Sequence, residues 1–342
     1  MRVRLSILDL APISRGQTAS DSFAGSVALA QRAEELGYER IWYAEHHNMA
    51  SIASSATSVL IAHVGAHTKS IRLGSGGIML PNHAPLMIAE QFGTLDAMYP
   101  GRIDLGLGRA PGSDQKTMYA LRRDPSSSES FPQDVQELQG YLNGQSRVRG
   151  VDAIPGKGSR VPLYILGSST FGAQLAAALG LPYAFASHFA PASLKAAIEA
   201  YKDGFRPSEQ LDRPYLIAGV NVAVADTAES ARQQLQEIRR MRTAGLYALQ
   251  RGVSAEDLSE AEVDQLLESG FAAHVDQMLT YTAAGTPNEV SDYLDDFLQF
   301  TGADELITVH QAPSIEGRLR SLNLLADAVG GVRPSVGAGS VA

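Results

Sequence analysis

The chain has 342 residues, of which 44% are hydrophobic and 19% are charged, so it can bury a large core and most of it is expected to be ordered. Its net charge of −9 argues against a nucleic-acid partner, because the basic cluster Arg239, Arg240 and Arg242 lies among Glu and Gln and is typical of a solvated helix face. The absence of cysteine excludes a disulfide framework, a thiolate metal site and a cysteine nucleophile, and the absence of a signal peptide or of about 18 uninterrupted apolar residues predicts a cytoplasmic protein without a membrane partner.

The hydrophobic pattern alternates between strand and helix periods along the chain. Strands are expected at residues 3–10, 40–44, 71–77, 103–109, 162–166, 183–186, 216–224 and 306–310. Each is followed by an expected helix, at residues 22–36, 53–67, 86–98, 132–142, 170–179, 191–205, 227–249 and 315–329. A further helix, 292–300, is expected behind a cap at Thr286 with Pro287 at the first helical position.

Eight strands that are each followed by a helix predict an α/β fold of the (β/α)8 TIM-barrel type. The alternative is a doubly wound sheet, but its phosphate loop normally follows the first strand, and residues 10–20 contain none. We expect a single barrel domain over residues 1–330, with insertions after strands 4 and 7 at about 113–160 and 250–285. The second insertion is expected to be a helical lid without a strand. Residues 331–342, rich in Gly and Ser, are expected to form a flexible tail.

In a TIM barrel, functional residues lie at the carboxyl ends of the strands. Gly76 and Gly77 end one strand, where missing side chains would let a planar ligand approach the backbone. Arg109 ends the next strand and offers charge to an anion, with a surface salt bridge as the alternative. The run Ser168-Ser169-Thr170 joins a strand to a helix, where hydroxyls and free amides can bind phosphate, with an ordinary helix cap as the alternative.

Several histidines also fall near strand ends. Consecutive strand residues point to opposite faces, so His46 and His47 cannot easily share one ion, and no metal site is expected. One of them is expected to act as a general base or proton donor, because histidine titrates near neutral pH, and the other to pack behind the strand. The candidate substrate-pocket residues, for each of which a packed polar role is the alternative, are His47, His83, His188 and His310.

Taken in order, four motifs of this sequence resemble the bacterial luciferase-like monooxygenase family. They are WYAEHH at 42–47, LGSGGIMLP at 73–81, GRIDLGLGR at 101–109, and the turn at 167–170 followed by GLP at 180–182. The match extends in order over roughly residues 3–190. The resemblance implies a TIM barrel that uses reduced FMN, supplied by a separate flavin reductase, and reacts it with O2.

The resemblance also implies roles for the flavin-side residues by position. Gly76-Gly77 matches a non-proline cis peptide beneath the flavin ring, and Arg109 matches an arginine in the phosphate region. Ser168, Ser169 and Thr170 match the phosphate cradle, and Ser187 matches a further flavin-side residue.

Two residues match the catalytic part of that family. Glu45 corresponds to an acidic residue in the site, and His46 to the histidine that acts in proton transfer. The sequence departs from the luciferases at Gly108, where they carry a reactive cysteine, so its chemistry cannot depend on a thiol. The departure predicts a luciferase relative rather than a luciferase.

The predicted function is therefore an FMNH2-dependent, two-component monooxygenase. Through a flavin C4a-hydroperoxide it would oxygenate an apolar or aromatic substrate, such as a long-chain aldehyde or an aromatic polyketide. The alternatives are an F420-dependent oxidoreductase that transfers hydride on the same barrel, and a flavin-binding protein without catalysis. Glu45, His46 and Arg109 together argue against the last. The resemblance implies a homodimer, for which the small-residue helix 53–67 is the candidate interface.

Overall fold

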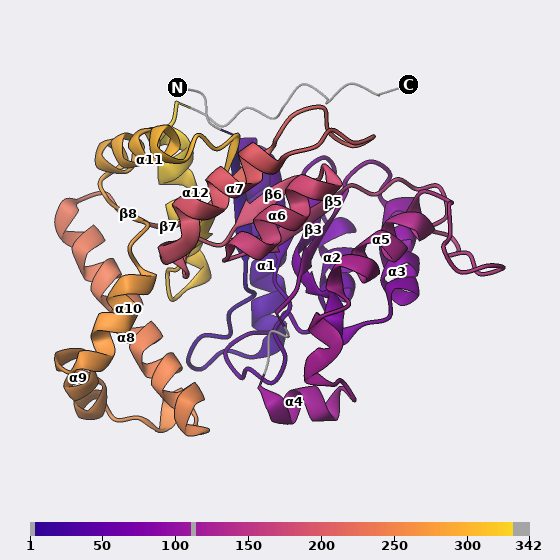
Figure 1. Cartoon of the computed structure of the whole chain (residues 1–342). Coiled ribbons are helices and arrows are strands. Elements are labelled where there is room, and N and C mark those ends of the chain that lie inside the picture. The colour runs from indigo at the N-terminus through magenta and orange to yellow at the C-terminus, as the bar shows by residue number, and fades with distance from the viewer. Residues whose placement is uncertain (1–3, 111–113, 331–342) are drawn as a thin grey trace.

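The computed structural model describes residues 4–110 and 114–330, which form a closed barrel of parallel strands (Figure 1). The strands are β1 Arg4–Asp9, β2 Arg40–Tyr43, β3 Arg72–Met79, β4 Ile103–Gly108, β5 Leu163–Gly167, β6 Tyr183–Phe185, β7 Leu216–Val224, β8 Thr282–Gly285 and β9 Glu305–His310. Their order is β6-β5-β4-β3-β2-β1-β9-β7-β8, and β6 also pairs with β7. Eight strands thus close the barrel, and β8 extends the sheet beyond β7. The predicted (β/α)8 fold is confirmed.

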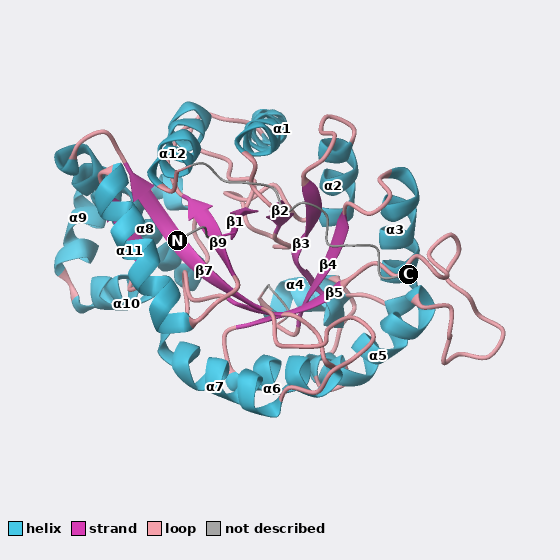
Figure 2. Cartoon of the chain, turned by 90° about the horizontal axis from the view of Figure 1, so that it is seen from above, coloured by secondary structure: helices cyan, strands magenta, loops and turns pink. Residues whose placement is uncertain are grey.

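Helices surround this barrel, as Figure 2 shows. They are α1 Ala19–Leu36, α2 Thr57–Gly65, α3 Pro85–Met98, α4 Gln115–Ala120, α5 Phe131–Leu142, α6 Thr170–Leu179, α7 Leu194–Gly204, α8 Ala228–Arg251, α9 Glu260–Glu268, α10 Gly270–Met278, α11 Pro287–Thr301 and α12 Ile315–Ala328. The predicted cap of α11 is present, with a capping box between Thr286 and Glu289. Within the described ranges, no helix is long and apolar enough to cross a membrane.

The strand β8 contradicts the prediction that residues 250–285 contain no strand. Its sequence, Thr-Ala-Ala-Gly, lacks the large branched and aromatic residues that signal a strand. The strand forms because its four residues pair with Asn221–Val224 of β7, and this pairing stabilises an extended conformation that the local sequence does not favour. The helical part of the prediction holds, since α9 and α10 lie in this segment.

Several helices also differ from the sequence prediction, among them α11, which begins at Pro287 rather than at residue 292. Helix α2 is shorter than 53–67 because the amide of Ala53 donates to the carbonyl of Ala11 instead of entering a helix. Helix α1 starts earlier than expected, behind a capping box formed by Thr18 and Asp21. Helix α4 lies in a stretch expected to be irregular. The predicted tail at residues 331–342 lies outside the described residues.

Side chains of the strands alternate between the barrel interior and the helical layer. The interior cluster contains Ile217 of β7 and both Ile307 and Val309 of β9. Their neighbours Ala218, Val220 and Leu306 belong to the larger outer core between the sheet and the helices. Since the period is two, the inward-facing positions continue through Gly219 and Asn221 in β7 and reach Gln311 just after β9.

A buried ion network occupies the amino-terminal end of the barrel. The guanidinium of Arg40 donates to Asp104 at 2.7 Å, to Glu305 at 3.0 Å and to the hydroxyl of Tyr164 at 2.8 Å. Asp104 also pairs with Arg72. Burial opposes ionisation of Asp104, but its two arginine partners hold its pKa below the usual value. These paired charges neutralise one another and stabilise the amino-terminal end of the barrel. We therefore expect a ligand site at the carboxyl-terminal end.

Candidate active site

The buried carboxylate of Glu45 lies at the centre of a hydrogen-bonded cluster just after β2. Its Oε1 is 2.9 Å from Nε2 of His47 and 2.9 Å from Nε2 of His83, and its Oε2 accepts from the amide of Met79 at 3.1 Å. Burial opposes ionisation of Glu45, but the bonds from His47 and His83 outweigh it and lower its pKa. The hydrogen bond between Glu45 and His47 in turn raises the pKa of the His47 imidazole. The cluster therefore favours a charged carboxylate beside a charged imidazole.

The pairing of Glu45 with His47 and His83 was not predicted. His47 was expected either to pack behind the strand or to line a substrate pocket, on the assumption that residues 45–47 alternate as in a strand. Strand β2 ends at Tyr43, so strand alternation does not apply to these residues. His46 is half-buried and lines an open hollow of 340 Å³ together with neighbouring residues of the loop after β2, namely Asn48, Met49, Ala50, Ile52 and Ser55.

The same three side chains have the donor set of a metal site. One ligand atom each from Glu45, His47 and His83 lies within 4.8 Å of the others. No metal site was predicted, because the adjacent His46 and His47 were expected to point apart. His47 and His83 are not adjacent but come from different loops, so that expectation does not concern them. Direct hydrogen bonds within the cluster already satisfy the buried carboxylate, so we treat it as an acid–base group.

The peptide bond between Gly76 and Gly77 is cis, as the resemblance implied. A Cβ on Gly76 would lie 2.7 Å from Cδ1 of Leu8, and a Cβ on Gly77 would lie 2.7 Å from the carbonyl oxygen of Gly106. Close packing against the backbone of β4 thus requires glycine at position 77, whereas the contact at Gly76 is with the movable end of a side chain in β1. Met79, two residues on, carries the amide that binds Glu45, which connects this peptide to the acid–base cluster.

An anion-binding arrangement lies at the ends of β4 and β5. The exposed guanidinium of Arg109 stacks on the ring of Phe171, the second residue of α6, at 4.0 Å from the ring centroid. Ser169 is the N-cap of α6, but its side chain makes no capping bond, and Ser168 and Ser169 are exposed. The predicted cation, the predicted hydroxyls and the amides of a helix start therefore lie together, and they provide what a phosphate group needs.

Two predicted residues after β6 face inward but are buried. The hydroxyl of Ser187 donates to the carbonyl of Gly219 at 2.6 Å and is inaccessible, so the structure gives it a packing contact. His188 is buried, and its Nδ1 has no hydrogen-bond partner among the described residues. Burial and the nearby charge of Arg242 lower the pKa of His188 to about 3, so its ring is neutral at neutral pH.

His310 takes the packed alternative rather than a place in a pocket. It follows the inward-facing Val309 in β9, so its ring points to the helical layer. Its Nδ1 lies 2.7 Å from the hydroxyl of Ser321, and its Nε2 lies 3.1 Å from the hydroxyl of Thr308. Burial, with a smaller effect of Arg318, lowers its pKa to about 3.

The role of Arg242 was not predicted from the sequence. A solvated helix face was expected at residues 239–242, and Arg239 and Arg240 do form exposed ion pairs with acidic residues of α9 and α10. Arg242 instead turns inward and bonds Asn221 of β7 and Gln311 after β9. Helical spacing could have signalled the difference, because position 242 lies near the face of Ile238, which is buried.

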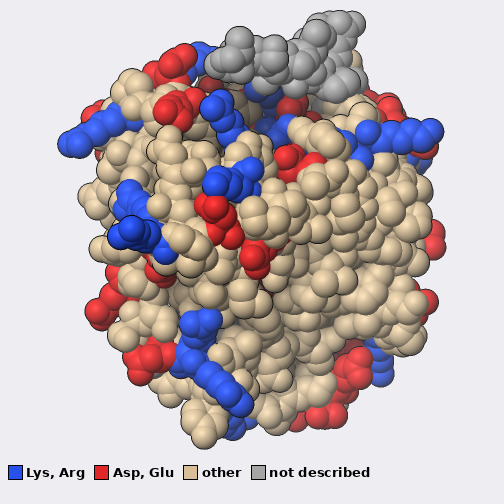
Figure 3. Space-filling model, turned by 90° about the vertical axis from the view of Figure 1, so that its right-hand side faces the viewer, with Lys and Arg blue, Asp and Glu red and all other residues tan. Residues whose placement is uncertain are grey.

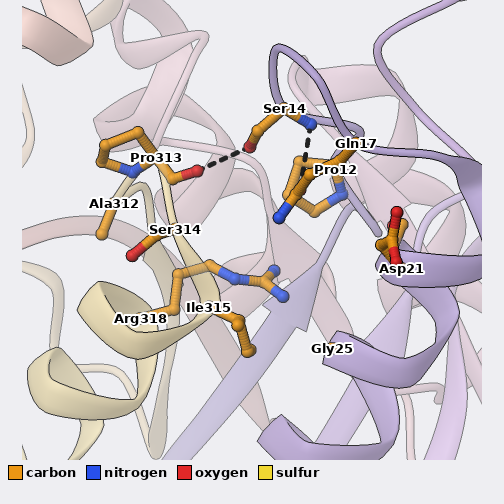
Figure 4. A pocket seen from close by; sticks show the side chains of 11 residues that line it. Pro12, Ser14, Gln17, Asp21, Gly25, Ala312, Pro313, Ser314, Ile315 and Arg318 are labelled. Atoms are coloured by element: carbon orange, nitrogen blue, oxygen red, sulfur yellow. Dashed lines mark hydrogen bonds between the residues drawn. The ribbon is translucent and has the colours of Figure 1, made fainter.

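A second hollow lies between the loop after β1 and the loop after β9 (Figure 4). Its volume is only 10 Å³. The hydroxyl of Ser14 in the first loop donates to the carbonyl of Pro313 in the second at 2.6 Å, which joins the two loops. The cation on its wall, Arg318, is paired with Asp9 at 2.8 Å. This hollow is too small for a flavin, and its charges are already balanced.

The carboxyl-terminal rim of this barrel thus combines a helix start suited to an anion, after β5, with a buried acid–base group after β2. Such a rim defines an enzyme of the TIM-barrel class that acts on a bound organic ligand. The sequence profile described as luciferase-like monooxygenase matches residues 3–305. The chain belongs to this family and is an oxidoreductase of the monooxygenase type.

Relatives and solved structures agree with this family. The chain is 45% identical over 327 residues to the luciferase-like monooxygenase of Escherichia coli (strain K12), which covers 95% of this chain and 96% of the relative. It is 33% identical over 343 residues to the N-acetyl-S-alkylcysteine monooxygenase of Bacillus subtilis (strain 168), with 96% and 98% covered. The crystal structure of apo-MsnO8 is similar with a TM-score of 0.84 and 35% identity over 97% of this chain and 99% of that one.

More distant structures share the fold. One is the oxygenating constituent of 3,6-diketocamphane monooxygenase from Pseudomonas putida in complex with FMN, with a TM-score of 0.68, 17% identity and 96% and 98% coverage. Another is the coenzyme F420-dependent tetrahydromethanopterin reductase of Methanopyrus kandleri, with a TM-score of 0.67, 16% identity and 96% and 98% coverage. At these identities the likeness concerns the fold alone.

Proposed function

We propose that the protein is a two-component monooxygenase that uses reduced FMN and O2 to oxygenate an apolar or aromatic organic substrate. The observation that carries this proposal is the contact of Arg109 with the uncapped start of α6, at the end of the strand that pairs with the one carrying the cis peptide Gly76-Gly77. A phosphate seat and a backbone platform on neighbouring strands suit a phosphorylated planar cofactor. A separate flavin reductase would supply the reduced cofactor.

Each group of residues has a defined task in this proposal. Ser168, Ser169 and Thr170 with the α6 amides would bind the phosphate, and Arg109 would balance its charge. When bound, reduced FMN supplies two electrons to O2, so that one oxygen atom enters the substrate and the other leaves as water. The chain itself would hold the proton needed for water formation at Glu45 and its histidines, with His46 facing the adjoining hollow.

Exclusion of water is the second requirement of this chemistry. The helices α8, α9 and α10 extend past the barrel on the side of β7 and β8 (Figure 1). Arg240 of α8 holds α9 through Glu260, and Arg239 holds α10 through Asp276. We propose that these three helices act as the lid of the active site.

FMN and F420 are distinguished by anaerobic titration followed by exposure to O2. We expect reduced FMN to bind the protein, and the mixed sample to show a transient absorbance that decays more slowly than that of free reduced FMN in air. Tight binding of reduced F420 without any response to reduced FMN would contradict the proposal and favour hydride transfer. Binding of reduced FMN without substrate-dependent product formation would favour a flavin-binding protein without catalysis.

Two variants separate cofactor binding from proton transfer. Arg109→Ala is expected to weaken reduced-FMN affinity by about 10-fold or more, because it removes a charge-assisted bond to phosphate. Arg147→Ala changes an exposed arginine in a loop and serves as the matched control. His46→Ala is expected to slow turnover with FMN still bound. Unchanged turnover in that variant would remove His46 from the reaction.

A further inference from the structure

Arg242 is a largely buried cation without an acidic partner. Its Nε donates to Gln311 at 3.1 Å, one terminal nitrogen donates to Asn221 at 3.0 Å, and the other lies 3.4 Å from the carbonyl of His188. All three acceptors are neutral. Every Asp and Glu of the chain lies in the described ranges, and none is within ion-pair distance of this guanidinium. Burial accordingly lowers the pKa of Arg242 to about 10.

Three other arginines with little exposure have acidic partners, whereas the half-buried Arg102, like Arg242, donates only to neutral acceptors. Arg40 and Arg72 pair with Asp104, and Arg318 pairs with Asp9. Taking a charge out of water without a counter-ion is costly, and proteins usually compensate it. The missing compensation at Arg242 points to a counter-ion that the chain itself does not supply.

The position of Arg242 suits a ligand. Asn221 and Gln311 occupy inward-facing positions near the carboxyl ends of β7 and β9. Around the barrel, β7 lies opposite β3, the strand that carries the cis peptide. Arg242 therefore faces the proposed flavin platform across the barrel mouth, where a substrate would lie. It also remains partly exposed, so a ligand can reach it.

The geometry leaves hydrogen bonds available. A guanidinium has five N–H groups, and the three described bonds leave one N–H on each terminal nitrogen. One free N–H on each of two nitrogens can donate to the two oxygens of a carboxylate. The neighbouring His188 adds no charge at neutral pH, because burial and Arg242 lower its pKa to about 3.

We propose that Arg242 binds the carboxylate of the substrate and thereby selects acidic organic molecules. This inference rests on the proposed oxygenase function and specifies its substrate class. Asn221 and Gln311 hold the guanidinium in place without neutralising it. The apolar part of the substrate then extends toward the flavin platform.

The test compares two probes that differ in charge but hardly in shape, para-fluorobenzoate and para-fluorobenzamide. Fluorine NMR titration at neutral pH is expected to show at least about 10-fold tighter binding of the benzoate to the full chain, as a charge-assisted bidentate pair implies. Arg242→Gln is expected to abolish this preference, and Arg242→Lys to keep part of it. Arg240→Gln, an exposed arginine on the same helix, is the control and is expected to keep the full preference.

Equal binding of the two probes to the wild-type chain, or a preference that survives in Arg242→Gln, would overturn the proposal. Loss of reduced-FMN affinity in Arg242→Gln would also overturn it, because Arg242 would then serve the cofactor phosphate. Failure of wild-type protein to bind reduced FMN would instead reject the proposed function. A measurement without variants uses phenylglyoxal, which modifies accessible arginines. The benzoate should protect Arg242 from modification and the benzamide should not.

Discussion

Glu45 shows what a single residue does in this site. Its carboxylate is buried, yet three donors hold it in the charged form. The strand-end rule predicted its place, and the resemblance predicted its acidic role. Neither predicted that His47 and His83 would be its partners, because these contacts depend on loops whose paths follow tertiary packing rather than a local period.

The charge of Glu45 should control the protonation of His47. Glu45→Gln keeps the shape but removes the charge, so the pKa of His47 should fall and its imidazolium should be lost at lower pH than in the wild-type chain. Turnover should fall about 100-fold if the pair handles the proton, with reduced-FMN affinity unchanged. Proton NMR titration of His47 and steady-state oxygen consumption measure the two effects. An unchanged pKa of His47 would contradict this account.

His310 should make the barrel sensitive to acid. Its pKa is about 3 in the folded chain and 6.5 as a reference value, so between these values the unfolded chain binds the extra proton. Stability due to this group is present above pH 6.5 and is lost as pH falls toward 3, by up to about 1.4 kcal/mol per pH unit. Urea unfolding of His310→Gln at several pH values should give a shallower slope than the wild-type chain. Equal slopes would show that His310 takes up its proton inside the folded barrel.

At the scale of elements, the sequence predicted those strands and helices that carry a strong period of their own. All eight barrel strands were found in this way, and the place of Ser168-Ser169-Thr170 at the start of α6 was predicted as well. Strand β8 was missed because its four residues have little strand propensity and depend on pairing with β7. Arg242 was missed because its neighbours Arg239 and Arg240 are exposed, and composition alone does not distinguish one face of a helix from another.

The contact between β3 and β4 depends on missing side chains. A Cβ on Gly106 would lie 2.2 Å from the carbonyl oxygen of Ser75, so Gly106→Ala should force the strands apart. We expect a loss of about 1–3 kcal/mol or more in the free energy of unfolding. Gly245→Ala is the matched control, because nothing lies within 4 Å of the added Cβ in α8. It should raise stability by about 0.5–1 kcal/mol. Chemical denaturation of both variants measures the difference, and equal stabilities would contradict the role of Gly106.

At the scale of the whole molecule, two neighbouring helices expose large apolar side chains. Helices α2 and α3 expose Val59, at 67%, and Met87, at 55%. Separately, Figure 3 shows a face of the molecule with a broad area of few charged side chains. An exposed apolar surface on helices that pack on each other is typical of a protein interface. It extends the predicted interface helix 53–67 to include α3.

We propose that α2 and α3 form a homodimer interface, and a dimer built on them should dissociate when they are charged. We expect the wild-type chain to be a dimer in light scattering and the double variant Val59→Asp, Met87→Asp to be a monomer with an unchanged circular dichroism spectrum. Charges placed in an apolar interface lose hydration without gaining partners. Tyr119→Asp alters an exposed residue of α4 and should leave the dimer intact. A monomeric wild-type chain would exclude this interface.

The short strand β8 brings the two ends of a long excursion together. The chain leaves the barrel after β7 and returns at Gly285, whose carbonyl accepts from the amide of Ala225 at 3.1 Å. Helices α8, α9 and α10 thus form a cassette whose two ends lie side by side. Arg242 belongs to this cassette, because it lies in α8. Such a cassette can be exchanged without opening the barrel. Substrate choice would then diverge among relatives through this one replaceable segment, while the proposed cofactor site on the opposite strands stays constant.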